Sequence, residues 1–131
     1  MKERIFLILV GAIFVGLGTY NLVLPVAGIS IFEIALVEVS SLNEIRANYG
    51  GMHLFLGMFF LYGALANRFR DAALLVVAVF TGGLVLGRLA SLMLDGSPNE
   101  AIWALLILEP VACLVAVLLL WRNLGSSDDG A

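Results

Sequence analysis

Two opposite charges lie inside apolar segments that are each long enough to cross a lipid bilayer. Arg88 comes six residues before Leu94, where one segment ends, and Glu109 comes eight residues after Ala101, where the next begins. At ~1.5 Å per residue, both charges lie roughly 9–12 Å below the same membrane boundary. Each would cost about 2.5–3.5 kcal/mol if it faced lipid. Because the two segments are consecutive and antiparallel, the sequence predicts an Arg88–Glu109 ion pair.

Other polar side chains occur at a similar depth. The preceding segment carries three of them at helical spacing, and one lies a turn beyond Arg88. The predicted polar cluster consists of Arg46, Tyr49, His53, Arg88, Ser91 and Glu109. Two interpretations stay open. The cluster is an internal brace, in which His53 and Tyr49 complete a hydrogen-bond network, or it lines a cavity for a small polar or amphiphilic ligand, since intramembrane ionisable residues are candidates for function.

The sequence offers few other groups that do chemistry. One histidine, one cysteine and scattered carboxylates have no recognisable metal-ligand spacing. Cys113 lies in an apolar run and is expected to be a small buried hydrophobe. There is no nucleophile motif, phosphate loop or basic nucleic-acid patch. We therefore expect no catalytic residue, metal, cofactor or nucleic-acid partner, and the sequence favours a protein that is not an enzyme.

The composition indicates the elements that hold these side chains. Of 131 residues, 62% are hydrophobic and 13% are charged, whereas about a quarter of the residues in soluble domains are charged. Apolar runs of about 20 residues cross a bilayer as helices. The sequence predicts an all-α, integral membrane four-helix bundle as one domain, 1–124, followed by a disordered polar tail, 125–131. The predicted spans are 5–24, 46–66, 72–94 and 101–121.

The link 26–45 is apolar but carries Glu33, Glu38 and Glu44, which disfavour a fifth span. Its partly helical spacing predicts an amphipathic segment, interfacial or re-entrant, between the first two spans. A pair of short strands is the competing interpretation. In the turn before the last span, Ser97 or Asn99 is a candidate helix cap.

Small residues recur at spacings that let helix backbones approach closely. Ala12 with Gly16 forms one pair, and Gly83, Gly87 and Ser91 form a longer row. Gly50 and Gly57, a heptad apart, mark a further face. These rows predict packing within the bundle, with a homodimer as the alternative.

Positive charges are distributed unevenly among the loops. Apart from Arg46 at the edge of the second span and Arg88 inside the third, they fall at one end of the predicted bundle: Lys2, Arg4, Arg68, Arg70 and Arg122. The positive-inside rule therefore predicts that both termini are cytoplasmic. We expect a multi-pass protein of the bacterial cytoplasmic membrane.

Several short motifs resemble one bacterial membrane family. They are Arg46-Ala47-Asn48-Tyr49-Gly50-Gly51, Gly57, Gly87-Arg88 with Ser91, Asp95-Gly96-Ser97-Pro98, and Glu109. In this order they resemble the family catalogued as domain of unknown function 4345, from about Ile5 to Leu120. The resemblance implies a four-helix membrane protein of unassigned activity, with a more distant likeness to DoxX-type bundles, and it supplies no catalytic residues. The family pattern usually has an apolar residue where this chain has Asn48, which either enlarges the polar cluster or faces the interface.

The function hypothesis that the sequence favours is an accessory subunit or a bundle that binds a small amphiphilic ligand. The bilayer is the surrounding medium, and a larger membrane complex or a second copy is a candidate partner. A small-solute transporter or channel is one alternative. Another is a membrane enzyme acting on a lipid or quinone, with His53 or Glu109 as acid or base.

Overall fold

The computed structural model describes residues 1–35 and 38–128, the last of these, 124–128, as backbone only. All regular structure in the described residues is helical, as the sequence predicts. The elements are α1 (Lys2–Val23), α2 (Pro25–Ile29), the 3₁₀ turn η1 (Ser30–Phe32), α3 (Val39–Ile45), the π-helical segment η2 (Arg46–Met52), α4 (His53–Leu65), the 3₁₀ turn η3 (Asn67–Phe69), α5 (Arg70–Leu94) and α6 (Glu100–Asp128).

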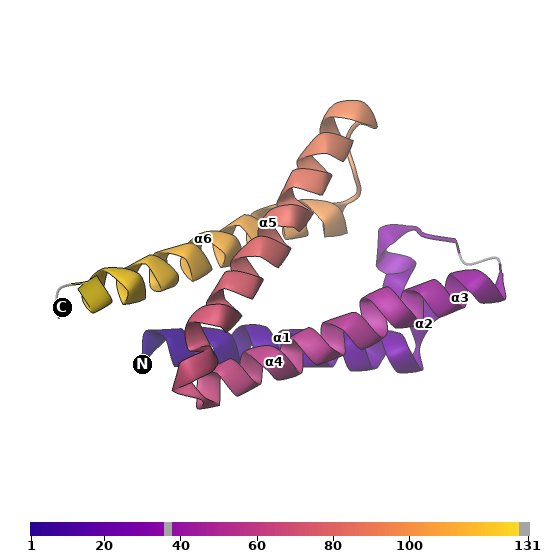
Figure 1. Ribbon diagram of the computed structural model, residues 1–131. Coiled ribbons are helices and arrows are strands. Elements are labelled where there is room, and N and C mark those ends of the chain that lie inside the picture. Colours follow the sequence, from indigo (N-terminus) through magenta and orange to yellow (C-terminus); the bar gives the residue numbers. More distant parts are fainter. Residues whose placement is uncertain (36–37, 129–131) are drawn as a thin grey trace.

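The long helices form two packed pairs. Helix α1 lies along α4, and α5 packs against α6. The N-terminus, η3 and the last turns of α6 lie together at what we call the terminal end (Figure 1). Elements α2, η1 and α3 and the α5–α6 connection lie toward the opposite end, the loop end. From the terminal end, α5 leans away from the α1–α4 pair, so the two pairs diverge toward the loop end.

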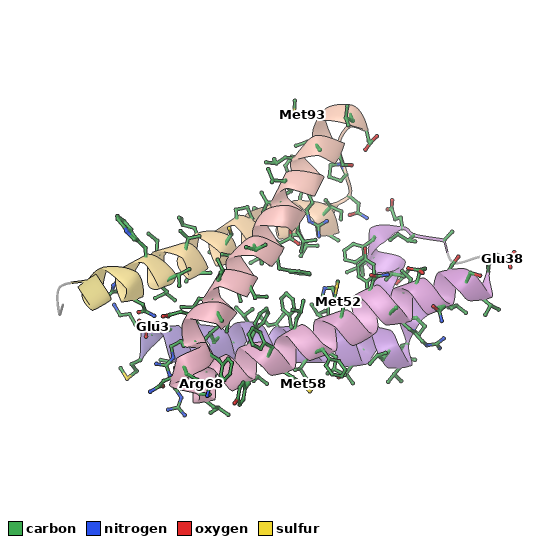
Figure 2. The ribbon with its side chains drawn as sticks, viewed as in Figure 1. Glu3, Glu38, Met52, Met58, Arg68 and Met93 are labelled. Atoms are coloured by element: carbon green, nitrogen blue, oxygen red, sulfur yellow. The ribbon has the colours of Figure 1, made fainter. Side chains whose placement is uncertain are left out.

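The apolar core lies near the terminal end, where the two pairs meet. It combines large side chains with alanines that let the helices approach: Leu7, Phe60, Ala64, Ala73, Leu74, Val77, Ala78, Ala116 and Leu119. The outward faces remain strongly apolar, as the sticks in Figure 2 show along α5 and α6. Phe55 is 70% exposed and Trp121 is 72% exposed. Such surfaces are suited to lipid or to a protein partner rather than to water.

Among the described residues, three helices are long and apolar enough to cross a membrane. They are Lys2–Val23, Asn67–Leu94, which includes η3, and Glu100–Asn123. They correspond to the first, third and fourth predicted spans. The predicted span 46–66 is divided between η2 and the 13-residue α4, so it does not form one long α-helix. The reason is the π-helical segment, which interrupts the α-helical hydrogen-bond pattern.

Helices α1 and α4 approach closely through glycines, but not through all those that the sequence indicated. A Cβ on Gly18 would contact the backbone of Leu54, and one on Gly50 would lie 2.8 Å from Leu22 Cγ. By contrast, Gly16 and Gly83 have nothing within 4 Å of an added Cβ, and neither has Gly87. The expected face at Gly50 and Gly57 is therefore confirmed. The rows at Ala12–Gly16 and Gly83–Gly87–Ser91 do not bring helices of this chain together, because an added Cβ at Gly16, Gly83 or Gly87 would meet no other atom.

The link between the first two spans is built from short helical pieces. Elements α2, η1 and α3 cover most of it, and among its described residues there is no strand, so the strand-pair interpretation is wrong. Glu33 ends η1 with a positive φ of 58°, which redirects the chain after that turn. Residues 36–37 lie outside the described part of the chain. At the other end of the molecule α6 continues to Asp128, into the tail predicted to be disordered, and 129–131 lie outside the described residues.

Asn99 joins the loop-end elements. Its side-chain oxygen accepts a hydrogen bond from the Ile102 backbone N–H (3.2 Å), which caps α6 as the sequence predicted. Its side-chain amide also donates to the Ile31 carbonyl in η1 (2.9 Å). One side chain thus ends a helix and holds a segment 68 residues away.

Candidate functional site

The predicted ion pair between α5 and α6 is present. Arg88 Nε donates to Glu109 Oε2 at 2.7 Å, and Arg88 Nη2 donates to Glu109 Oε1 at 2.8 Å. The side chains are 19% and 10% exposed. Two parallel charge-assisted bonds fix the guanidinium plane as well as its position. Pro110 follows Glu109 within α6, and because proline has no N–H, one backbone hydrogen bond of the helix is absent beside the carboxylate.

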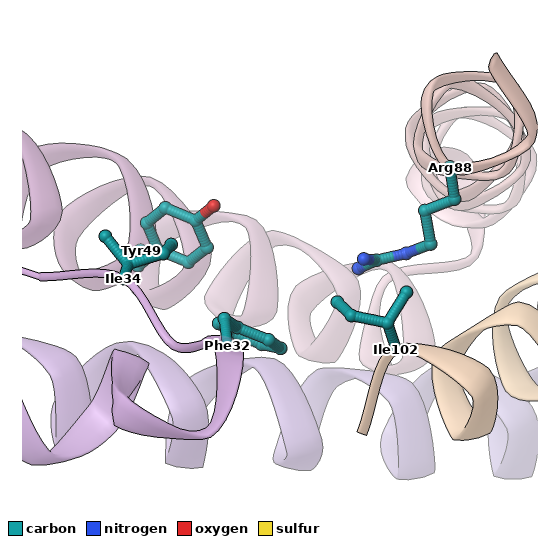
Figure 3. Close-up of a pocket in the computed structure, with 5 residues that line it drawn as sticks. All are labelled: Phe32, Ile34, Tyr49, Arg88 and Ile102. Atoms are coloured by element: carbon teal, nitrogen blue, oxygen red, sulfur yellow. The ribbon is translucent and has the colours of Figure 1, made fainter. Parts of the chain in front are cut away.

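The remaining side of the guanidinium faces a cavity. No acceptor among the described residues binds Nη1, so its N–H groups are available. The cavity has a volume of about 210 Å³ and is lined by Phe32, Ile34, Tyr49, Arg88 and Ile102. Figure 3 shows the guanidinium reaching toward Phe32 and Ile102, with Tyr49 and Ile34 on the far side. The divergence of the two helix pairs leaves this space.

A second hollow also borders Arg88. It measures about 200 Å³ and is lined by Gly87, Arg88, Ser91, Leu92, Gly96, Pro98 and Ile102. Ser91 does not join the ion pair, because its hydroxyl donates to Asp95 Oδ2 at 2.8 Å. Arg88 and Ile102 line both of these small spaces.

His53 lies among aromatic rings. Its ring stacks on Phe14 with a centroid distance of 5.3 Å and on Tyr49 at 5.9 Å, and it meets Phe80 edge-on at 5.6 Å. Its Nδ1 lies 2.9 Å from the Asn48 carbonyl. Because a carbonyl only accepts, Nδ1 carries the hydrogen, and in neutral His53 the acceptor nitrogen is Nε2.

The π-helical segment η2 positions Tyr49 and Arg46. Arg46 Nε donates to the Leu22 carbonyl at 3.1 Å, which satisfies an acceptor at the C-terminal end of α1. Asn48 donates from its side chain to the carboxylate and the carbonyl of Glu44. Asn48 therefore does not enlarge the polar cluster with its side chain, and Arg46 lies at the α1 end rather than at the ion pair.

The six predicted site residues thus fall into separate groups. Arg88 and Glu109 form one, Tyr49 and His53 form an aromatic stack, and Arg46 and Ser91 bond elsewhere. Within the described residues no hydrogen bond joins Tyr49 or His53 to the ion pair. The hydrogen-bond network of the brace interpretation is therefore not formed among the described residues, and the His53 ring contacts Tyr49, Phe14 and Phe80 instead. Tyr49 and Arg88 are nevertheless brought together as walls of one cavity.

The sequence interpretation missed the apolar walls of the cavity and the rings around His53. Phe14, Phe32, Phe80 and Ile102 were not among the predicted site residues, because apolar side chains occur throughout the predicted spans and the link. The available signal was the helical spacing between Tyr49 in η2 and His53 at the start of α4, which puts the two rings on one face. Cys113, expected to be buried, is half-buried and makes a weak contact from Sγ to the Ala78 carbonyl at 3.4 Å.

This geometry defines an all-helical protein with three helices long and apolar enough to cross a membrane and an ion pair between two of them. In the described residues no three His, Cys, Asp or Glu side chains are grouped to hold a metal ion.

The chain belongs to the family described as a domain of unknown function, DUF4345, whose model matches residues 3–120. The resemblance noted from the sequence motifs is therefore confirmed. No curated protein and no solved structure matches the chain significantly.

Proposed function

We propose that this chain is a four-span integral membrane protein that binds a small amphiphilic molecule beside Arg88. Three of the spans are the long apolar helices. The fourth is the helical path through η2 and α4, whose 7 and 13 residues extend about 30 Å together. That length matches the hydrocarbon thickness of a bilayer. The path lies along α1, and its outward residue Phe55 is 70% exposed.

The orientation follows from the basic residues at the terminal end. Figure 2 labels Arg68 and Glu3 at this end of the molecule. Arg68 lies over the Phe69 ring at 4.7 Å, and Arg70 donates to the Ala64 carbonyl and to Asn67. Under the positive-inside rule this end faces the cytoplasm of a bacterial cell, so the cavity beside Arg88 lies in the outer half of the membrane.

The observation that carries the binding proposal is that Glu109 binds only some of the N–H groups of the Arg88 guanidinium. Glu109 holds Arg88 through Nε and Nη2, no described residue binds Nη1, and Arg88 is one of the walls of the cavity. The ion pair can therefore act both as a structural brace and as part of a binding site. The Glu109 carboxylate offsets the buried charge of Arg88, and the guanidinium, fixed in position, can donate hydrogen bonds to a bound molecule. Aromatic and aliphatic walls with one or two polar groups are typical of small-molecule sites.

Native mass spectrometry of the full chain, purified in mild detergent, tests the proposal. We expect a bound small molecule with wild type, and its loss in Ile102→Trp, which fills the cavity. Leu108→Trp is the matched control, because Leu108 lies on the same helix and is 63% exposed. A wild-type protein without any bound molecule, or equal retention in Ile102→Trp, would contradict the proposal.

An accessory subunit of a larger membrane complex is a second candidate. It is favoured by the open row at Gly83 and Gly87, where nothing lies within 4 Å of an added Cβ, beside the exposed Leu86. Small residues next to large ones are typical of helix–helix contacts in membranes. This role predicts co-purification with specific partners, which Gly83→Leu reduces; free protein from a gentle native purification argues against it.

A transporter is less well supported. It needs a polar path across the terminal half of the bundle, and the buried side chains described there form the apolar core. A liposome flux assay that shows solute exchange above protein-free vesicles would favour it.

A further inference from the structure

The chemistry of the cavity beside Arg88 limits what it can hold. Resting on the proposed function, we propose that its guest is an uncharged amphiphile with a carbonyl oxygen that accepts a hydrogen bond from Arg88. Two kinds of molecule share this chemistry: the ring of a prenylated quinone and the ester of a neutral glyceride.

The charge of the guest follows from the ion pair. Arg88 is the sole charged side chain among the described residues that line the cavity, and Glu109 already neutralises it. An anionic headgroup would place a second negative charge against one guanidinium, which leaves a net charge in a medium of low dielectric constant. A cationic headgroup would be repelled by the positive charge of the Arg88 guanidinium. An uncharged guest avoids both costs.

The hydrogen-bond character of the guest follows from the donors. A guanidinium donates and does not accept, so the group opposite it must be an acceptor. Tyr49 supplies a hydroxyl on the opposite wall, and no described residue binds it. A carbonyl oxygen between these groups satisfies N–H donors that otherwise have no partner in this cavity.

The size and walls of the cavity indicate the shape of the guest. A volume of about 210 Å³ is smaller than the roughly 300–1,000 Å³ of sites that enclose drug-sized ligands. The cavity therefore takes a headgroup, and an apolar tail extends along the exposed helix faces. Phe32 and Tyr49 have ring centroids 6.3 Å apart and are inclined by 40°. Together with Ile34 and Ile102 they form walls suited to a flat, uncharged group.

The experiment is a thermal-shift titration of the full chain in dodecylmaltoside with three probes. Decylubiquinone tests the quinone ring, dioleoylglycerol tests the neutral ester, and dioleoylphosphatidic acid tests an anionic headgroup. We expect one uncharged probe to raise the unfolding midpoint by at least ~2 °C, with no rise for phosphatidic acid. Ile102→Trp should abolish the shift, and Leu108→Trp should keep it. Which of the two uncharged probes raises the unfolding midpoint shows whether the guest is a quinone or a neutral glyceride.

The outcomes separate this inference from the proposed function. A larger shift with phosphatidic acid than with either uncharged probe, lost in Ile102→Trp, overturns the uncharged guest and leaves the binding site standing. Equal responses of wild type and Ile102→Trp to all three probes, or no response at all, overturn both. An Arg88→Lys variant adds a readout: it retains the charge but loses the planar donors, so its midpoint shift should fall while phosphatidic acid remains without effect.

Discussion

Gly57 of α4 lies against the backbone of Val15 of α1 with no room for a side chain between them. A Cβ at position 57 would lie 2.6 Å from the Val15 nitrogen and 2.8 Å from the Gly11 carbonyl oxygen. Both contacts are with backbone, which cannot rotate away as a side chain can. The spacing of the α1–α4 pair, and with it the position of Tyr49 and His53, therefore depends on this glycine.

Gly57→Ala should destabilise the protein. The added methyl group forces α1 and α4 apart, and overpacking of this kind costs about 1–3 kcal/mol. Unfolding by SDS in mixed micelles, followed by circular dichroism, measures the change in free energy of unfolding.

Gly16→Ala and Gly83→Ala are the matched controls for this substitution. Both positions are helical and have nothing within 4 Å of an added Cβ. Because alanine loses less backbone entropy than glycine in a helix, these variants should be neutral or more stable by about 0.5–1 kcal/mol. Equal destabilisation at positions 16, 57 and 83 would show that the close approach is not responsible.

Neutralising either partner of the Arg88–Glu109 pair should lower stability strongly. Arg88→Gln leaves a carboxylate without its cation, and Glu109→Gln leaves a guanidinium without its anion. Removing one partner of a buried pair typically costs about 3–5 kcal/mol. The midpoint of thermal unfolding in detergent should fall for both variants, and the exchanged pair Arg88→Glu with Glu109→Arg should recover part of the loss.

Ser91→Ala is the control for the charge pair, because it lies a turn away on α5 and bonds an exposed aspartate. Its change should stay within about 0.5 kcal/mol. If Arg88→Gln and Glu109→Gln both unfolded at the same temperature as the wild type, the ion pair would have no structural role. The proposal that Glu109 fixes Arg88 in position would then be wrong.

The ion pair could be predicted from sequence because its geometry depends on little else. A short connection makes α5 and α6 antiparallel neighbours. Two residues at similar numbers of positions from that connection, one on each helix, therefore lie at a similar depth in the membrane. The glycines at which two helices pack closely could not be predicted in the same way. Spacing along the sequence indicates which residues share a helix face, but not which other helix that face contacts. Gly11 and Gly18 lie on the buried face of α1 with Leu7, whereas Gly16 does not.

The sequence left a cavity open as one interpretation, but the position and the walls of the cavity could not be predicted, for a related reason. It exists because α5 leans away from the α1–α4 pair, and that angle is set by packing at the far end of the bundle. The π-helical segment had no clear local signal either. An extra residue in each turn changes the rotational position of the side chains of Arg46–Met52 about the helix axis.

Two variants of Asn99 should separate its two hydrogen bonds. Asn99→Asp keeps the oxygen that caps α6 but loses the N–H that binds Ile31, and Asn99→Ala loses both. Amide hydrogen exchange should therefore rise in Ser30–Phe32 for both variants. In the first turn of α6 it should rise only for Asn99→Ala, whose lost cap is worth about 0.5–2 kcal/mol. Unchanged exchange in Ser30–Phe32 for both variants would show that Asn99 does not hold that segment.

The path through η2 and α4 should cross the membrane, which places its two ends on opposite sides. Single cysteines in a Cys113→Ala background test this at Ser40 in α3 and Asn67 in η3, both exposed. On intact cells an impermeant maleimide should label Ser40→Cys and Ser97→Cys from outside. Asn67→Cys should react only after permeabilisation, because η3 lies at the terminal end with the basic residues.

The labelling pattern also distinguishes four spans from three. If only α1, α5 and α6 crossed, Ser40→Cys and Asn67→Cys would react from the same side, and the two ends of the chain would lie on opposite sides of the membrane. We expect the result for four spans, since the N-terminus, η3 and the last turns of α6 share one end (Figure 1). Asn123 on α6 also donates to Asp71 on α5 there at 2.7 Å. Labelling of positions 40 and 67 from a common side would therefore refute both the topology and the outer position of the cavity.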